Sequence, residues 1–138
     1  MLRYVHWEVM RILIICIALW AAYGLHAQND ELSRLHTCGY LNGRYWGESL
    51  NEYLRIAYLS GVQDMAGRRD EGFWPQGATL GEVKQALDQF YQDPANLRIA
   101  ILDAITVVRM RFQGINSKFV EAETETLRRQ AAICSGVK

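Results

Sequence analysis

The sequence predicts a small all-α domain: a bundle of four to five helices that follows a cleaved signal peptide and is tied by one disulfide. Three observations carry this prediction. Apolar residues recur at spacings of three and four, two capping-box patterns mark helix starts, and Cys38 and Cys134 flank the helical region. With 138 residues, the chain has room for one such domain.

The start of the chain has the pattern of a secretory signal peptide. Arg3 and Arg11 give it a positive charge, an unbroken apolar run follows, and Ala27 is a small residue at the cleavage point. The run is shorter than the roughly 20 apolar residues of a membrane-spanning helix, although an uncleaved anchor is the alternative. We therefore expect a signal peptide at 1–27, a single helical domain at 28–138 and a periplasmic or secreted protein that meets the membrane only through the signal segment.

The charge balance argues against nucleic acid as a partner. The chain has 15 basic and 15 acidic residues, and loss of Arg3, Arg11 and Glu8 with the leader leaves a net charge of −1. Nucleic-acid-binding domains are usually basic. The pairs Arg68-Arg69 and Arg128-Arg129 are more typical of a solvated loop or helix face.

Two cysteines stay with the exported domain. Cys16 leaves with the leader, so only Cys38 and Cys134 remain. In an oxidising compartment, two cysteines near opposite ends of a small domain are expected to pair. The alternative is two separate buried thiols.

The first long helix is expected to begin at a capping box formed by Ser49 and Glu52 and to stop near Gly67. Its expected buried stripe consists of residues spaced by three and four: Leu50, Leu54, Ala57, Tyr58, Gly61, Val62 and Met65. Ile56 and Leu59 widen this stripe, which indicates a central helix.

Two further helices are expected after a second capping box, Thr79 and Glu82. The stripe of the shorter helix is Val83, Leu87, Phe90 and Tyr91. Asp93 and Pro94 should end it and start a third helix, because Asp is a good N-cap and Pro is tolerated at the first helical position. The third helix would bury Leu97, Ile101, Ala104, Ile105, Val108 and Phe112, and Gly114 supplies its stop.

A fourth, more polar helix begins at Asn116 or Ser117. Its inward residues are expected to be Val120, Leu127, Ala131 and Cys134, which puts Cys134 on the buried stripe. Nearer the N-terminus, residues 29–35 are a candidate for a further short helix. The Asn42-Gly43 pair predicts a turn and a small hairpin.

The sequence holds no recognisable catalytic pattern. His36 is the only histidine after the leader, which excludes a histidine-rich metal site within one chain. His36 and Cys38 could hold a metal or act as a Cys–His pair, but an oxidised Cys38 could do neither. The carboxylates are scattered singly, and no Gly-rich phosphate loop or Gly-x-Ser-x-Gly motif is present. We expect no catalysis, no cofactor and no metal. The opposite possibility is an exported enzyme whose catalytic carboxylates are dispersed in the sequence.

Two aromatic groups are candidates for binding. Tyr40, Tyr45, Trp46 and Tyr53 gather around a turn, as a surface that stacks on sugars or peptides would; packing against the first long helix is the favoured use. Phe73 and Trp74 sit in a loop beside Arg68 and Arg69, and Trp and Arg are residue types that anchor protein interfaces. A structural role is favoured over this binding role: Phe73 would fill the gap between helices and Trp74 would half-cover it. Arg68, Arg69, Phe73 and Trp74 are nevertheless the candidate binding residues.

Part of the chain resembles a known family. The run from Phe73 to Val83 (FWPQGATLGEV), then Phe90-Tyr91, the Asp93-Pro94 boundary and the apolar helix that ends at Phe112, is similar to the core of the Rap/Tai-like immunity proteins, which protect bacteria from type VI amidase effectors. Residues 58–64 (YLSGVQD) resemble that family's first core helix. The resemblance spans about Cys38 to Phe112.

This resemblance implies a small all-α periplasmic protein, often dimeric, that binds and blocks a cell-wall hydrolase. The implied fold is like that of periplasmic acid-stress chaperones. The chain departs from the family at two cysteines, whose places hold Trp74 and, near Phe112, Gln113 and Gly114. Both are missing together, as when one disulfide is lost as a unit, and Cys38 and Cys134 would replace it.

These observations predict an exported, non-catalytic helical domain that binds another protein. The specific expectation is an immunity-like inhibitor of a cell-wall hydrolase effector, and a homodimer is an expected assembly. The alternative is a protein that binds a small ligand or a cell-wall glycan through Tyr40, Tyr45 and Trp46.

Overall fold

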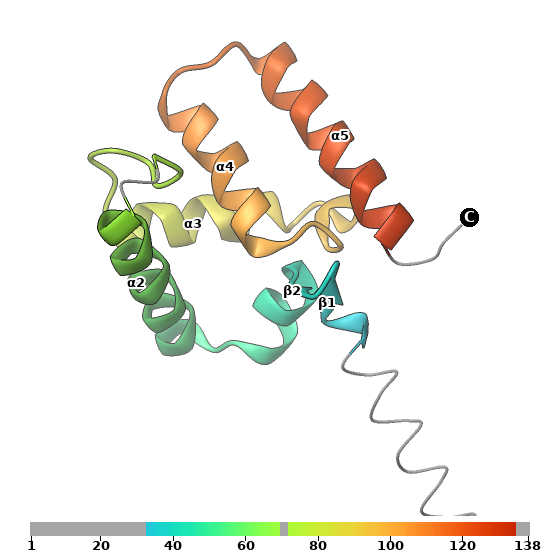
Figure 1. The fold of residues 1–138 in the computed structure, drawn as a ribbon, viewed down its shortest axis with the longest axis horizontal. Coiled ribbons are helices and arrows are strands. Elements are labelled where there is room, and N and C mark those ends of the chain that lie inside the picture. The colour runs from blue at the N-terminus through green and yellow to red at the C-terminus, as the bar shows by residue number, and fades with distance from the viewer. Residues whose placement is uncertain (1–32, 70–71, 135–138) are drawn as a thin grey trace, which may run out of the picture. The chain divides into compact units, whose positions relative to one another are not determined.

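Helices make up most of the computed structural model, which describes residues 33–69 and 72–134 (Figure 1). In chain order the elements are β1 (His36–Thr37), β2 (Tyr40–Leu41), a π-helical turn η1 (Tyr45–Ser49), α2 (Glu52–Arg69), α3 (Leu80–Phe90), a 3₁₀ turn η2 (Pro94–Asn96), α4 (Ile101–Phe112) and α5 (Ser117–Cys134). The all-α class is confirmed, with one small hairpin. The predicted signal peptide and most of the short helix predicted at 29–35 lie outside the described residues.

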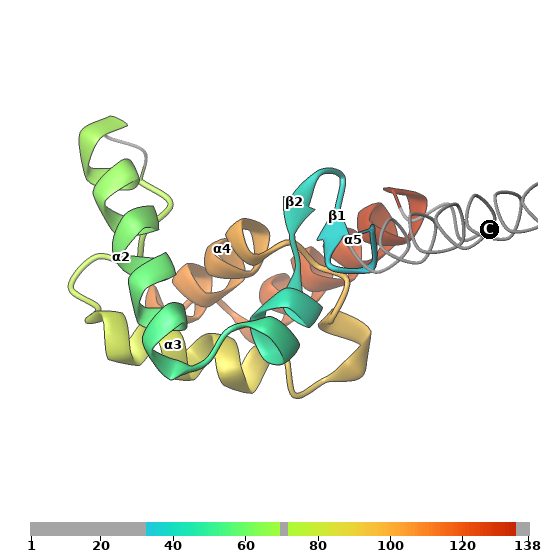
Figure 2. The ribbon, with the colours of Figure 1, turned by 90° about the horizontal axis from the view of Figure 1, so that it is seen from below.

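The four long helices pack in chain order. α2 lies against α3, α3 against α4 and α4 against α5, so α2 and α5 are on opposite sides of the α3–α4 pair (Figures 1 and 2). The core forms where α3 and α4 meet: Val83, Leu87, Ile105 and Val108 are fully buried there. Because α4 has neighbours on several sides, Val107 is buried as well, and α4 is the central helix.

Local capping signals set three helix ends as predicted. Thr79 Oγ1 accepts from the Glu82 amide at 3.3 Å, and Glu82 Oε2 accepts from the Thr79 amide at 2.8 Å, which completes the capping box of α3. Gly114 takes a positive φ of 69° after α4. The amides of Gly114 and Ile115 then donate to carbonyls in the last turn of α4, in a Schellman motif. Asn116 Oδ1 accepts from the Lys118 amide at 2.9 Å and begins α5.

The prediction for α2 was wrong in its start and in part of its buried face. Asn51, not Ser49, caps the helix, because its Oδ1 accepts from the Leu54 amide at 3.0 Å. The helix also continues past Gly67 to Arg69. Its buried positions are Leu59, Val62 and Ala66, whereas three members of the predicted stripe, Leu54, Ala57 and Gly61, are exposed. α2 has apolar residues on both faces, and packing against α3 selects one of them.

The prediction for the start of α4 was also wrong. Asp93 caps only the turn η2, where its Oδ1 accepts from the Ala95 amide at 2.9 Å. The chain then turns through Leu97 and is extended at Ala100 before α4 begins at Ile101. Phe112, predicted to be inward, is exposed at the other end of the helix.

The predicted hairpin exists, but it turns four residues earlier than expected. β1 and β2 pair antiparallel, with His36 opposite Leu41 and Thr37 opposite Tyr40. The two turn residues, Cys38 and Gly39, have φ values of 50° and 85°, as a type I′ turn requires. Asn42 instead forms an isolated bridge with Ala100, and its Oδ1 accepts from the Arg44 amide at 3.0 Å.

Two side-chain networks hold the turns between elements onto the helices. Trp46, 1% exposed, donates from Nε1 to Asp88 Oδ1 of α3 at 2.8 Å. Arg55 of α2 donates to the same oxygen at 3.0 Å, so α2, η1 and α3 meet at one carboxylate. On the other side, Arg128 of α5 donates to Asp93 Oδ2 at 2.6 Å, which anchors α5 on η2. Arg128 thus lies on a helix face, as the sequence suggested, but it is paired there and only partly exposed.

Candidate functional site

The predicted binding loop lies between α2 and α3. Arg68 and Arg69 are the last two residues of α2, and Phe73 and Trp74 follow in the loop. Phe73 and Trp74 are both partly buried and pack against the hydrophobic core, and Pro75 after them is buried. Their aromatic rings therefore close one end of the core, and only part of each is accessible to a partner.

The end of α4 lies beside this loop. The Arg109 guanidinium donates a hydrogen bond to the Gly72 carbonyl, which joins α4 to the first described residue of the loop. Two donors at this junction, Trp74 Nε1 and Arg109 Nε, are buried and have no acceptor in the described part of the chain.

An exposed apolar tip continues from that end of α4. We define the apolar tip as residues 112–119, the last residue of α4, the connection and the first turn of α5. Phe112, Ile115 and Phe119 are 45%, 41% and 69% exposed. Arg109 and Arg111 precede Phe112, Lys118 lies within the tip, and no acidic residue occurs between Asp103 and Glu121. The tip therefore combines apolar and positively charged groups.

This tip could not be recognised from the sequence, because the helical spacing of α4 continues to Phe112. The stop at Gly114 was recognised, but a stop alone does not tell whether the last apolar residue faces inward. The absence of acidic residues over 17 positions is the signal that could have marked the segment.

A cleft lies at the opposite end of α4 and α5. Its volume is about 370 Å³, within the range of small-molecule sites. The floor is formed by buried residues of three segments: Thr37, Ile99, Ala100, Leu127 and Ala131. The rim is more polar and exposed, and it includes Cys38, Tyr40, Asp103 and Gln130.

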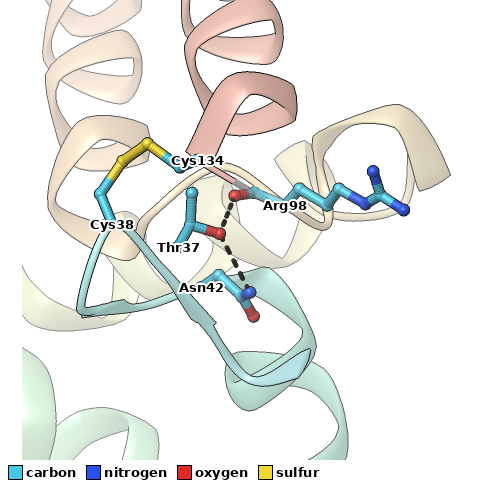
Figure 3. The surroundings of a disulfide bond; sticks show 5 residues. All are labelled: Thr37, Cys38, Asn42, Arg98 and Cys134. Carbon is cyan, nitrogen blue, oxygen red and sulfur yellow. Dashed lines mark hydrogen bonds between the residues drawn. A yellow bond between two sulfur atoms is a disulfide. The ribbon is translucent and has the colours of Figure 1, made fainter. Parts of the chain in front are cut away.

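A covalent bond and hydrogen bonds hold the walls of this cleft (Figure 3). Cys38 of the hairpin and Cys134 at the end of α5 form a disulfide with a Cα–Cα distance of 5.3 Å, which confirms the predicted pair. Cys134 itself is exposed and does not lie on the buried stripe, because the bond forms at the surface end of α5. Thr37 Oγ1 donates to the Arg98 carbonyl at 2.6 Å and accepts from Asn42 Nδ2 at 3.2 Å.

Asp103 is the charged group of the cleft. Loss of water around its carboxyl, and then the negative charge of Glu123 on α5, raise the pKa of Asp103 above its ordinary value of 3.8. With the other described residues it forms neither a hydrogen bond nor an ion pair. Its carboxylate is therefore available to a ligand at the rim.

Of the four aromatic residues predicted to gather around the first turn, two pack in or against the core and two are exposed. Trp46 is buried, so it packs in the core and is not available for stacking on a sugar. Tyr45 is partly buried and also packs against the core. Tyr40 is exposed on the rim of the cleft, and Tyr53 is exposed on α2. The favoured interpretation, packing, holds for Trp46 and Tyr45.

Metal and membrane signals are both absent from the part of the chain that the structure describes. Residues 33–69 and 72–134 contain no group of three His, Cys, Asp or Glu side chains placed to hold a metal ion. Cys38 is oxidised, so it cannot act with His36 as a thiolate. None of the helices within these ranges has the length and apolar character needed to span a membrane.

Comparison with known proteins gives no assignment. No family model, no curated protein and no solved structure matches the chain. The resemblance to the Rap/Tai-like immunity proteins, and with it the function, stays a prediction.

Proposed function

We propose that the chain is an exported, non-catalytic helical domain that binds another protein through the end formed by the apolar tip and the loop before α3. The observation that carries this proposal is the tip itself, where Phe112, Ile115 and Phe119 are exposed together beside Arg111 and Lys118. Clustered exposed apolar residues with a polar rim are typical of interaction sites.

The charge of the tip defines the partner. With Arg109, Arg111 and Lys118 and no acidic residue nearby in sequence, the surface favours a partner patch that is apolar at its centre and acidic at its rim. The loop contributes through the exposed parts of Phe73 and Trp74, which Arg109 holds beside α4 through the Gly72 carbonyl. Arg68 and Arg69, the other two residues of the predicted binding set, are the last two residues of α2.

The specific partner we propose is a cell-wall hydrolase, which the domain would inhibit. The support is the resemblance of residues 38–112 to the Rap/Tai-like immunity proteins, together with a disulfide that suits an oxidising compartment. Export is part of this proposal. The intact mass of the protein recovered from the periplasmic fraction should correspond to a chain that begins at Gln28.

A digestion assay tests the inhibitory role. Purified cell-wall sacculi are incubated with an envelope extract from the protein's own source, with and without the oxidised protein. The proposal predicts slower release of soluble fragments with the wild-type chain. Phe119→Ser should remove this effect, whereas Tyr53→Ser, a matched change at an exposed aromatic residue of α2, should preserve it.

Two results would contradict the proposal. One is fragment release that the wild-type chain leaves unchanged. The other is sedimentation of the protein with anionic phospholipid vesicles that depends on Phe119, because a basic apolar tip of this kind also suits a membrane surface.

A further inference from the structure

The cleft beside the disulfide has the features of a preformed ligand site. Its floor is apolar, with Ile99, Ala100 and Leu127 buried, and its rim carries hydrogen-bonding groups. The Cys38–Cys134 bond joins the hairpin to the end of α5 across it. Because the walls are already fixed, a ligand would lose little free energy in ordering them.

The charge of the cleft is one-sided. Among its lining residues, Asp103 is the only ionisable side chain that carries a full charge at neutral pH, and none is Lys, Arg or His. The electrostatic effect of Glu123 on Asp103 adds a second negative group from α5. The buried Tyr91 phenol is the other titratable group that interacts with Asp103, and it stays neutral because burial raises its pKa. The cleft therefore attracts cations and repels anions.

Asp103 can accept a hydrogen bond from such a cation. No described residue supplies the carboxylate with a hydrogen bond or an opposite charge. It is exposed at the rim, so a ligand can reach it from solvent while the rest of the molecule rests on the floor. Tyr40 lines the same rim with an exposed aromatic ring, a group that attracts cations.

We propose that this cleft binds a small organic cation, with its apolar body on the floor and its ammonium group on the Asp103 carboxylate. A volume of about 370 Å³ holds roughly 12 water-sized groups, so the ligand has about a dozen non-hydrogen atoms. Gln130 places an amide on the rim for one further hydrogen bond. The site lies at the end of α4 and α5 opposite the apolar tip, so it is independent of the protein-binding proposal.

Three small probes of similar shape separate charge from shape. Phenethylamine carries an ammonium group, 2-phenylethanol is neutral and phenylacetate is an anion. Each is titrated into the oxidised full chain, and amide shifts of Thr37, Leu102 and Gln130 report binding at the cleft by NMR. We expect phenethylamine to bind about threefold to tenfold more tightly than the alcohol, a range suited to an exposed charged hydrogen bond, and phenylacetate to be the weakest.

Matched variants assign the effect to Asp103. Asp103→Asn should reduce phenethylamine affinity to that of the alcohol and leave the alcohol unchanged. Asp64→Asn, the same substitution at an exposed residue of α2, should change neither. Tyr40→Ala should weaken both probes, because it removes part of one wall. Equal affinity of the three probes, shifts outside the cleft, or an amine affinity that Asp103→Asn does not alter would each overturn the proposal.

Discussion

The backbone of Gly43 packs directly against the ring of Tyr91. A Cβ atom built at Gly43 would lie 2.3 Å from two carbons of that ring, closer than any real contact. The Gly43 amide and the Tyr91 hydroxyl both donate to the Ile99 carbonyl, at 3.2 and 3.1 Å. This contact joins the segment after the hairpin to the end of α3, and it leaves no room for any side chain at residue 43.

Gly43→Ala should destabilise the fold. The added methyl group would force the buried Tyr91 ring to move, and such overpacking costs about 1–3 kcal/mol. Gly47→Ala is the matched control, because a Cβ at Gly47 meets nothing within 4 Å. Urea unfolding of the two variants measures the difference, and equal free energies of unfolding would show that the contact is not tight.

Removal of the Cys38–Cys134 disulfide should lower stability substantially. The bond connects residues 96 positions apart, and closing a loop of that length stabilises the fold by roughly 3–5 kcal/mol, mainly by restricting the unfolded chain. The double variant Cys38→Ser/Cys134→Ser should therefore melt well below the oxidised wild type. Reductant should lower the Tm of the wild type and leave the double variant unchanged. If reductant left the wild-type Tm unchanged, the disulfide would not contribute to stability as we predict.

Trp74→Ala should cost more stability than its place in a loop suggests. The ring is partly buried against the core, so its loss leaves a cavity and exposes apolar surface, at about 1–3 kcal/mol. Tyr53→Ala is the control, since Tyr53 is 87% exposed. Thermal unfolding that ranks Tyr53→Ala as the more damaging change would refute this assignment.

The Asp103→Asn variant should show a characteristic pH dependence. Loss of water and Glu123 raise the pKa of Asp103 in the folded protein, so the fold favours the protonated carboxyl. That favourable contribution is present below the ordinary value of 3.8 and is lost as the pH rises through the raised pKa. Asn cannot ionise and does not lose this contribution. The Tm difference, variant minus wild type, should therefore be larger at pH 7 than at pH 3.5.

The informative quantity is the change in this Tm difference between pH 3.5 and pH 7. Asp103 lies in the first turn of α4, where a negative charge also interacts favourably with the helix N-terminus, so the sign at a single pH is a sum of two effects. A relative Tm of Asp103→Asn that falls as the pH rises would contradict the direction of the pKa shift.

Local chemistry explains which parts of the fold were predictable from the sequence. The capping box of Thr79 and Glu82 and the stop at Gly114 depend on residues within one helical turn, and both appear in the structure as predicted. The disulfide was predictable because Cys38 and Cys134 are the only two cysteines after residue 27.

The rest depends on packing between distant segments. α2 carries apolar residues on both faces, so helical spacing alone cannot tell that Leu59 is buried and Leu54 is exposed. The cleft is built from residues near 37–40, 99–103 and 127–131, and no local pattern brings these together. Asp103 is an ordinary carboxylate in the sequence, and only the fold places it at the rim of that cleft.

The most direct test of the protein-binding account is a pull-down with the oxidised protein as bait against periplasmic and secreted fractions of its own source. The account predicts that the wild type and the Tyr53→Ser control recover a cell-wall hydrolase, and that Phe112→Ser/Phe119→Ser does not. Recovery of nothing at micromolar bait, or equal recovery by all three proteins, would contradict it.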